Sequence, residues 1–336
     1  MLKVLSILIL SISCSGIKPI SNQTNSEKKI KAPVVVEPLI RLEQKVVLQP
    51  GKVKFVNFDI NLADGMHSLK CNNQSIPFFV ENKKARIFMA ESYFSKLKPY
   101  KCQFKMTDVL DVSVKPFPYK SEKLNVDKKR VVLSKKDLAR AIKEKKIVKK
   151  VYKNSSSYFL FNKEFRKPLT SFITSYYGNK RLFNNKKRSQ HLGNDLRAAV
   201  GVGIPVANKG KVVFVGDLFF SGNVVIVDHG LNIFTMYGHL SKIKVTEGMI
   251  INKGDIIGLA GATGRVSGPH LHWGVKINGH WVDGFSLVEE SKKMFNEKHD
   301  IAIQIIKGGA KAGDVHGVDA LSGATLTSRG VNHTIH

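Results

Sequence analysis

Short runs of β-branched and aromatic residues, separated by turn residues, dominate the pattern of the chain at residues 45–118. Apolar runs such as Val53 to Val56 and Val109 to Val114 alternate with turn pairs such as Pro50-Gly51 and Asn72-Asn73. Regular turn spacing between short apolar runs is typical of a small all-β sandwich. We therefore expect a small β-sandwich-like domain at 45–118, with a spacing or docking role.

A second set of alternating apolar runs, interrupted by glycine every few residues, begins near residue 170. Five of these runs are predicted to be strands: Lys211 to Val215, Asn223 to Val227, Ile233 to Tyr237, Ile256 to Ala260 and His270 to Val275. Tight glycine turns leave little room for helices, so we expect an antiparallel sheet domain at 170–288. The predicted fold class is mainly β, with few helices.

The region between the two sets, 119–169, has a helical pattern. Ser134 followed by Asp137 resembles a capping box, and apolar residues then recur at helical spacing among eight Lys and Arg. This pattern predicts a basic amphipathic helix that connects the two β regions. We interpret its charges as a solvated outer face, and a membrane-surface or wall-binding role is the alternative.

The first 44 residues have the layout of an export signal and a tether. A positive start is followed by an apolar stretch, Val4 to Ile12, as in a secretory signal peptide. Cys14 comes directly after Ser11-Ile12-Ser13, which resembles the lipobox of bacterial lipoproteins and implies acylation of Cys14; the alternative is a cysteine lost with a cleaved signal. We therefore assign 1–14 to the signal, 15–44 to a linker, and the protein to the periplasm or cell envelope, anchored by lipid.

The charge of the chain is strongly positive. Its 336 residues contain 54 Lys and Arg against 26 Asp and Glu, a formal net charge of +28. Such a charge favours anionic partners, and export excludes nucleic acid from the expected ones. No apolar run reaches the ~18 residues of a spanning helix, so a polytopic membrane protein is not expected. The anionic surface of the cell envelope is the expected partner.

Two cysteines follow the linker, Cys71 and Cys102. In an oxidising compartment an even pair favours a disulfide. Two buried free thiols are the alternative.

Histidine and aspartate residues cluster within the second β region. His191 and Asp195 are four residues apart, His270 and His272 are two apart, and His239 ends the run Tyr237-Gly238-His239. On a strand, residues two or four apart point to the same face, so each pair can converge. Imidazole and carboxylate ligands that leave a fourth position open are typical of a catalytic zinc site.

Together these motifs resemble the lysostaphin/LytM-type zinc metallopeptidases, whose pattern is H-x-x-x-D, then Y-x-H, then H-x-H. The resemblance covers about Thr170 to Leu287. It implies that His191, Asp195 and His272 bind Zn²⁺, and that His239 and His270 lie beside a zinc-bound water. No HExxH helix is present, so histidine has to serve as the base.

The resemblance implies a secreted or lipid-anchored zinc endopeptidase that hydrolyses peptide bonds of peptidoglycan. All five metal-site positions are present, which favours activity. The alternative is a non-catalytic LytM-like module that activates a cell-wall amidase.

Three nearby features have simpler interpretations. His229 lies before a glycine turn, and we expect it to be a structural, hydrogen-bonding residue and not a fourth ligand. His280 is expected in a hairpin turn, exposed and inert. The glycines from Gly258 to Gly264 are predicted strand turns, because a phosphate-binding loop needs a helix behind it.

The C-terminal extension, 289–336, combines a short helical stretch with a different motif. Asp319 to Thr325 resembles the flavinylation motif D-x-x-S-G-A-T of the FMN-carrying subunit of sodium-translocating NADH:quinone reductases. The resemblance implies covalent FMN on Thr325 and, as a third interpretation, a flavinylated redox protein. About 40 residues cannot provide a flavin-binding core. We therefore favour a fusion remnant that forms a loose extension.

Overall fold

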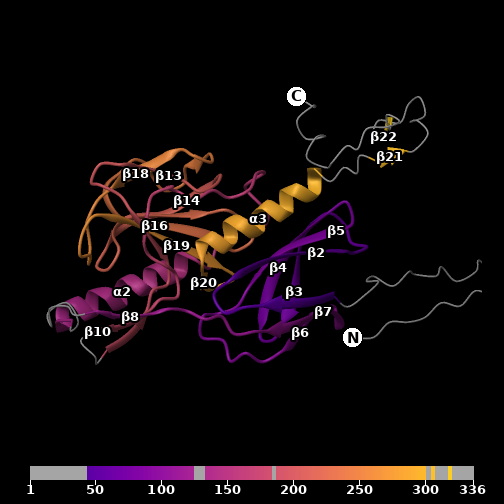
Figure 1. Ribbon diagram of the computed structural model, residues 1–336, viewed down its shortest axis with the longest axis horizontal. Helices are drawn as coiled ribbons and strands as arrows, with labels where there is room; N and C mark the ends of the chain where they lie inside the picture. Colours follow the sequence, from indigo (N-terminus) through magenta and orange to yellow (C-terminus); the bar gives the residue numbers. More distant parts are fainter. Residues whose placement is uncertain (1–43, 125–132, 184–186, 300–303, 307–316, 320–336) are drawn as a thin grey trace, which may run out of the picture. The chain divides into compact units, whose positions relative to one another are not determined.

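The computed structural model describes residues 44–124, 133–183, 187–299, 304–306 and 317–319 (Figure 1). Strands make up most of the described elements, and the two described helices are α2 (Lys135–Val151) and α3 (Gly284–His299). The predicted fold class, mainly β with a helix between two sheet regions, is confirmed. Neither described helix is long and apolar enough to cross a membrane.

Seven strands form the N-terminal sheet, in the order β1-β7-β6-β3-β4-β5-β2. β1 runs parallel to β7, and the other neighbours are antiparallel. Inward-facing residues, among them Leu69, Phe78 and Leu110, form its core. The bounds of the strands are β1 Gln44–Leu48, β2 Val53–Asp59, β3 Gly65–Cys71, β4 Gln74–Glu81, β5 Lys84–Ala90, β6 Tyr100–Phe104 and β7 Thr107–Val114.

A disulfide joins Cys71 and Cys102. The two cysteines lie directly opposite each other on β3 and β6, and both are buried. The predicted pairing is confirmed, and the alternative of two free thiols is wrong for this fold.

Ten strands form the second sheet, whose central order is β17-β14-β15-β16-β19-β12-β9. β18 pairs with β16 and with β13, and β20 pairs with β19. All five strands predicted from the sequence are present. The bounds are β9 Ile173–Ser175, β12 Asn194–Arg197, β13 Gly203–Pro205, β14 Gly210–Leu218, β15 Gly222–Asp228, β16 Ile233–Ile243, β17 Ile250–Ile251, β18 Ile256–Ala260, β19 His270–Ile277 and β20 His280–Val282.

The two faces of this sheet have different coverings. Val225, Tyr237, Leu271 and Trp273 belong to the main core on one face. Successive residues of a strand point to opposite faces, so His272, which lies between Leu271 and Trp273 on β19, points to the other face. A smaller cluster on that face contains Val224, Ile226, Phe234 and Met236.

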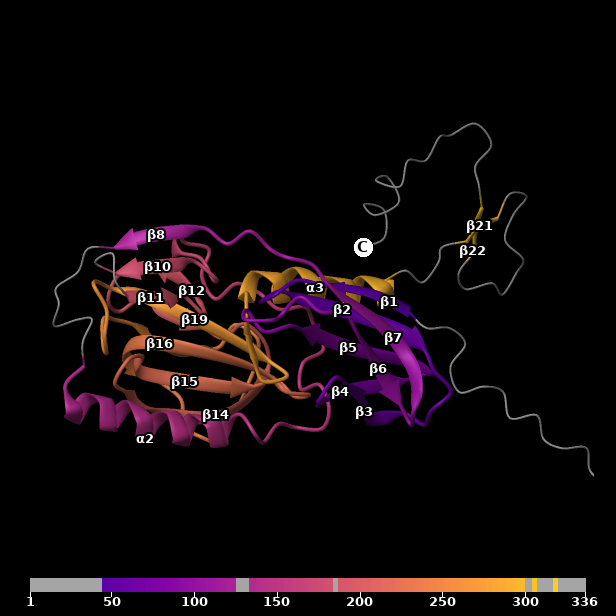
Figure 2. The same cartoon turned by 90° about the horizontal axis from the view of Figure 1, so that it is seen from below.

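Helix α2 lies on the face that carries the smaller cluster. Val148, Val151 and Tyr152 at its C-terminal end pack against the cluster, and the helix runs alongside β14 (Figure 2). The Ser134 side chain accepts a hydrogen bond from the Asp137 N–H at 3.1 Å, so the predicted N-cap is confirmed. No residue of α2 is fully buried. The helix therefore packs on the sheet along one side and is exposed on the other.

Helix α3 joins the two sheets. Its Ser286 hydroxyl and Glu290 carboxylate accept the backbone N–H groups of Val53 (3.0 Å) and Phe55 (2.9 Å) on edge strand β2. Lys52 Nζ lies 2.7 Å from the carboxylate of Asp283, next to the start of the helix.

The hairpin between β19 and β20 also contacts the N-terminal sheet. Asn278 donates its side-chain N–H to the Phe88 carbonyl at 2.9 Å, and a ring nitrogen of His280 lies 3.1 Å from the Gln74 side-chain oxygen. His280 is therefore half-buried, and burial lowers its pKa. The expectation of an exposed His280 is wrong, because the hairpin tip rests on the other sheet.

Two smaller sheets complete the described part. β8 (Ser121–Leu124), β10 (Lys180–Phe183) and β11 (Lys187–Gln190) form one of them, in the order β11-β10-β8. β21 (Gln304–Ile306) and β22 (Gly317–Asp319) form a parallel pair. The predictions for Cys14 and Thr325 lie outside the described residues.

Candidate metal centre

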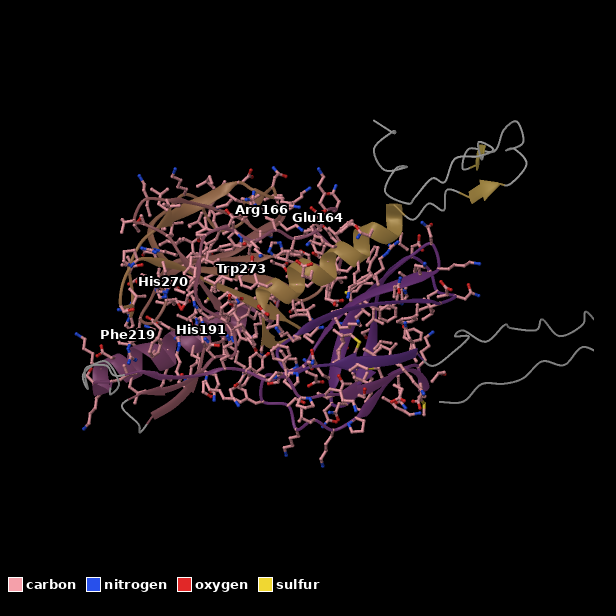
Figure 3. The ribbon with its side chains drawn as sticks, viewed as in Figure 1. Glu164, Arg166, His191, Phe219, His270 and Trp273 are labelled. Atoms are coloured by element: carbon pink, nitrogen blue, oxygen red, sulfur yellow. A yellow bond between two sulfur atoms is a disulfide. The ribbon has the colours of Figure 1, made fainter. Side chains whose placement is uncertain are left out.

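Three of the sequence-predicted residues meet on the sheet face described above. Asp195 on β12 lies directly opposite His272 on β19 in the antiparallel register. His191 lies just before β12, in the turn that follows β11. Figure 3 shows His191 and His270 on the same side of the domain.

The convergence of His191 and Asp195 has a different origin from the one expected. The sequence placed both on one strand, but β12 begins at Asn194 and His191 precedes it. A turn through Gly193 brings the imidazole back over the strand. The predicted meeting is correct, and the predicted reason for it is wrong.

The distances among these side chains are those of a metal-binding set. Asp195 Oδ1 lies 3.0 Å from His191 Nε2 and 2.8 Å from His272 Nδ1, and the two ring nitrogens are 3.3 Å apart. Zinc–nitrogen bonds of about 2.0–2.1 Å in a tetrahedron place two ligands about 3.3 Å apart. The three ligand atoms therefore fit one zinc ion after small outward movements.

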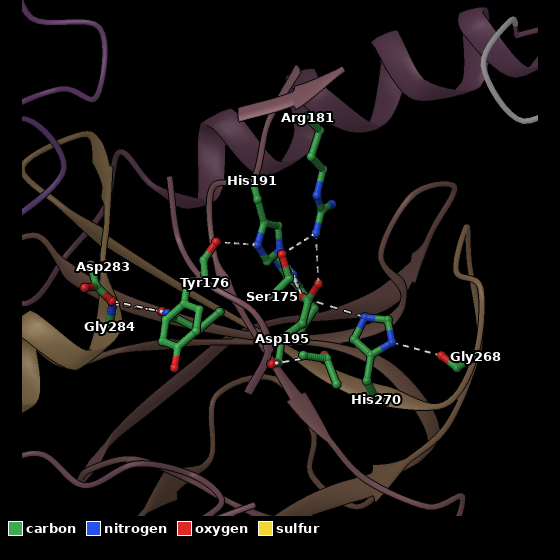
Figure 4. Close-up of polar contacts among 12 residues, drawn as sticks. Ser175, Tyr176, Arg181, His191, Asp195, Gly268, His270, Asp283 and Gly284 are labelled. Atoms are coloured by element: carbon green, nitrogen blue, oxygen red, sulfur yellow. Dashed lines mark hydrogen bonds and ion pairs between the residues drawn. The ribbon is translucent and has the colours of Figure 1, made fainter. Parts of the chain in front are cut away.

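Hydrogen bonds fix which ring nitrogen of His191 faces this set. Its Nδ1 lies 3.0 Å from the backbone carbonyl of Tyr176, as Figure 4 shows. A carbonyl only accepts, so Nδ1 carries the proton and Nε2 keeps a lone pair for a metal. Burial lowers the pKa of His191, which keeps the ring neutral.

Asp195 is held as a carboxylate. Burial raises its pKa, but hydrogen bonds and charge interactions with His191 and His272 outweigh burial and hold the pKa well below its usual range. Its second oxygen, Oδ2, lies 3.4 Å from Arg181 Nη2, and the same nitrogen donates to Ser175 Oγ at 2.7 Å. Arg181 thus orients the carboxylate from behind.

The two remaining predicted histidines lie beside the set. The ring centroids of His239 and His270 are 4.8 Å apart, and those of His239 and His272 are 5.9 Å apart. His239 Nδ1 lies 2.9 Å from the Thr263 carbonyl, and His270 Nδ1 lies 2.9 Å from the Gly268 carbonyl. In both rings, Nε2 therefore keeps the lone pair. His270 Nε2 is 3.7 Å from Asp195 Oδ1.

His239 has an unusual backbone conformation. Its φ is +63°, in the left-handed region that favours glycine, and its N–H donates to the Ser221 carbonyl at 2.7 Å. The register of β16 against β15 and against β18 shifts around this position. Bulges of this kind redirect a side chain, and such strain is common at functional sites. Burial, followed by the nearby His272, lowers the pKa of His239 to about 4.

His229 has the structural role predicted for it. The ring is fully buried, with Nδ1 2.8 Å from the Lys209 carbonyl and Nε2 2.7 Å from Thr235 Oγ1. Both ring nitrogens are occupied inside the core. His229 is therefore not a fourth ligand.

Sequence reasoning missed the residues that support the ligands. Arg181 lies within the region of resemblance, but no role was predicted for it, and the part played by Gly193 was not foreseen. The Asn194 side chain reaches Asp283 Oδ1 at 3.2 Å and accepts the Gly284 N–H at 3.1 Å, which ties β12 to the start of α3. The polar residue Asn194, between Gly193 and Asp195, could have indicated that a side chain of β12 makes hydrogen bonds to another element.

The chain resembles known peptidases in this region. Residues 189–284 match the model of Peptidase family M23. Peptidoglycan DD-endopeptidase ShyA of Vibrio cholerae is 38% identical over 112 residues, 33% of this chain and 26% of that protein. DD-carboxypeptidase/endopeptidase Mpg of Neisseria meningitidis is 33% identical over 129 residues, 38% of this chain and 30% of that protein. The chain thus spans less than a third of either relative.

A second class of relative is also similar. One subunit of the Na⁺-translocating NADH-quinone reductase of Vibrio alginolyticus is 36% identical over 134 residues, which are 38% of this chain and 45% of that protein. The aligned stretch is longer than the C-terminal extension, 289–336.

The fold comparison covers more of the chain. A crystal structure described as peptidase M23 from Pseudomonas aeruginosa is similar with a TM-score of 0.56 and 25% identity, over 75% of this chain and 97% of that one. The sheet that brings the histidines and Asp195 together therefore belongs to a domain of Peptidase family M23, of the lysostaphin/LytM type.

Proposed function

We propose that the protein is a zinc-dependent endopeptidase that hydrolyses peptide bonds of peptidoglycan. The observation that carries the proposal is the convergence of His191 Nε2, Asp195 Oδ1 and His272 Nδ1, beside two further histidines, His239 and His270. In this proposal the three atoms hold one Zn²⁺. When bound, zinc supplies a Lewis acid that polarises a carbonyl and activates water.

The chain's own residues supply proton transfer. A pKa of about 4 keeps His239 neutral at neutral pH, and its Nδ1–H is already bound to the Thr263 carbonyl. His239 Nε2 is therefore a proton acceptor, and His270 Nε2 is a second one 3.7 Å from Asp195. In the proposed reaction one of them takes a proton from the attacking water, and the same ring then gives that proton to the leaving amine.

The substrate and the compartment follow from the same proposal. The relatives named as peptidoglycan endopeptidases support the substrate class. The Cys71–Cys102 disulfide is typical of an oxidising compartment. We therefore place the protein in the periplasm or cell envelope. Acylation of Cys14 is part of this proposal.

Digestion of murein sacculi by the purified protein tests the proposal. The parent should bind about one zinc per chain and release peptides, whereas His191→Ala, Asp195→Ala and His272→Ala should do neither. A variant that digests as fast as the parent would contradict the ligand set. A parent that binds zinc but releases no peptide, and that accelerates a cell-wall amidase, would favour the activator alternative.

A further inference from the structure

The lysines of α2 form a strongly charged surface. The helix carries seven lysines, all exposed, at positions 135, 136, 143, 145, 146, 149 and 150. None of them forms an ion pair with an acid of the described residues, whereas Arg140 pairs with both Glu144 (2.6 Å) and Asp217 (2.9 Å). The lysine charges therefore face solvent.

The helix presents these lysines outward because its other side is used for attachment. Arg140, Glu144, Val148 and Val151 contact the sheet domain and lie along one side. At about 100° per residue, Lys135, Lys146 and Lys149 fall on the opposite side. Leu138 and Ile142, 50% and 49% exposed, lie on that outward side too.

Helix α2 lies on the same sheet face as the metal centre. The helix covers the sheet face to which His270 and His272 point. Glu144 accepts the Phe219 N–H at 2.8 Å, and two residues later the Ser221 carbonyl holds the N–H of His239. Figure 4 shows the helix passing behind His191 and Arg181.

We infer that the outward side of α2 binds the carboxylate-bearing peptide chains of peptidoglycan, the polymer whose bonds the adjacent centre cleaves. The inference rests on the proposed function for its choice of polymer. Single exposed ion pairs contribute little, but several lysines facing a polymer with repeated carboxylates act together through effective concentration.

An anionic bilayer is the competing partner, since Leu138 and Ile142 are partly exposed among the lysines. The geometry favours the polymer. The metal centre lies on the sheet face that α2 covers, so flexible chains of the proposed substrate polymer could contact both α2 and the site. Lysines, as compact and strongly hydrated charges, suit such diffuse recognition.

Sedimentation with intact sacculi tests the inference. Full-length protein carrying Asp195→Asn, which prevents digestion, is compared with the same protein carrying Lys135→Gln, Lys146→Gln and Lys149→Gln. The matched control carries Lys70→Gln, Lys96→Gln and Lys98→Gln, three exposed lysines of the N-terminal sheet domain. At low salt, the helix variant should bind at least about fivefold more weakly and the control nearly as well as its parent. Amidation of the sacculus carboxylates, or high salt, should abolish the difference.

Several outcomes would overturn the inference. Equal losses in the helix variant and the control would mean that net charge alone drives binding. Retention on phosphatidylglycerol vesicles that depends on α2, without α2-dependent retention on sacculi, would assign the surface to a membrane. Because binding is measured without hydrolysis, α2-dependent retention would support the inference even if the parent cleaved nothing, in which case only the endopeptidase proposal would fail.

Discussion

Gly193 lies directly against the imidazole of His272, so that a Cβ at position 193 would stand 2.6 Å from His272 Nε2. Real side chains do not approach so closely, and the ring would have to move. Because Nδ1 of the same ring faces Asp195, any displacement reaches the metal centre. We therefore predict that Gly193→Ala lowers zinc affinity about 10- to 100-fold, the range for lost supporting contacts. Zinc titration measures it.

Gly203→Ala is the control for this change. Its new Cβ would meet only Ile256, at 3.4 Å, and the backbone there has no left-handed φ. Zinc affinity should stay at the parent level. If the two variants bound zinc equally well, the contact between position 193 and His272 would have no influence on the centre.

Loss of Arg181 should weaken the same centre from the other side. Arg181→Ala removes the donor to Asp195 Oδ2 and to Ser175 Oγ, so the carboxylate can rotate. We expect zinc affinity to fall by about tenfold or more, with partial recovery in Arg181→Lys. Arg197 lies at the exposed end of β12, the strand that carries Asp195, and Arg197→Gln should leave zinc affinity unchanged. Parent-like zinc binding by Arg181→Ala would refute an orienting role.

Glu144 should affect His239 and not the metal. Its carboxylate accepts the Phe219 N–H, and the same loop holds the strained backbone of His239 through Ser221. Glu144→Ala should lower kcat by about tenfold, equivalent to ~1.4 kcal/mol, with zinc affinity unchanged. Glu144→Gln keeps an acceptor oxygen and should restore most of kcat. Equal kcat values for the Ala and Gln variants would rule out the hydrogen bond as the cause.

Stability should fall as the pH drops below the ordinary range of histidine. Burial lowers the pKa of His229 from 6.5 to about 4, so the folded state disfavours its protonated form. The unfolded chain binds the proton first. The stabilisation from the neutral ring is therefore complete above pH 6.5 and is lost as the pH falls toward 4, by at most ~1.4 kcal/mol per pH unit.

His229→Gln isolates this contribution. The variant should be less stable than the parent at pH 7, because hydrogen bonds to Lys209 and Thr235 are lost or lengthened. Urea unfolding at a series of pH values should show this gap shrinking between pH 6.5 and 4. A gap that stays constant across that range would mean that His229 does not titrate on unfolding.

The C-terminal extension should be dispensable for hydrolysis. Deleting residues 300–336 removes the whole segment with the flavinylation-like motif and leaves α3 intact. Sacculus digestion should continue at the parent rate, and a loss of activity would contradict the interpretation as a loose extension. Co-expression with a flavin transferase, followed by mass spectrometry, tests Thr325 separately: an unmodified mass would exclude the flavinylated interpretation.

The convergence of the candidate ligands was partly predictable, because Asp195, His270 and His272 lie in short motifs on strands. Alternation along β19 places His270 and His272 on one face, and this inference needs only local geometry. The position of His239 was taken from the resemblance alone. Its left-handed φ depends on the Ser221 carbonyl, which lies in another part of the chain and leaves no local pattern.

The contacts between the two sheets were not predictable for the same reason. Gln74 and His280 meet across more than 200 positions of the chain, so neither residue's neighbours in the sequence indicate the contact. The hairpin turn at His280 was foreseen from the sequence. What the pattern could not give was the surface against which its tip rests.

The position of α3 beside β2 also bears on self-association. The last strand of a sheet exposes N–H and C=O groups that can pair with a strand of another molecule. Here Ser286 and Glu290 already accept the outward N–H groups of Val53 and Phe55. Helix α3 thereby covers edge strand β2 of the N-terminal sheet. Replacing Glu290 by a residue without an acceptor would leave the Phe55 N–H free to pair with a strand of another molecule.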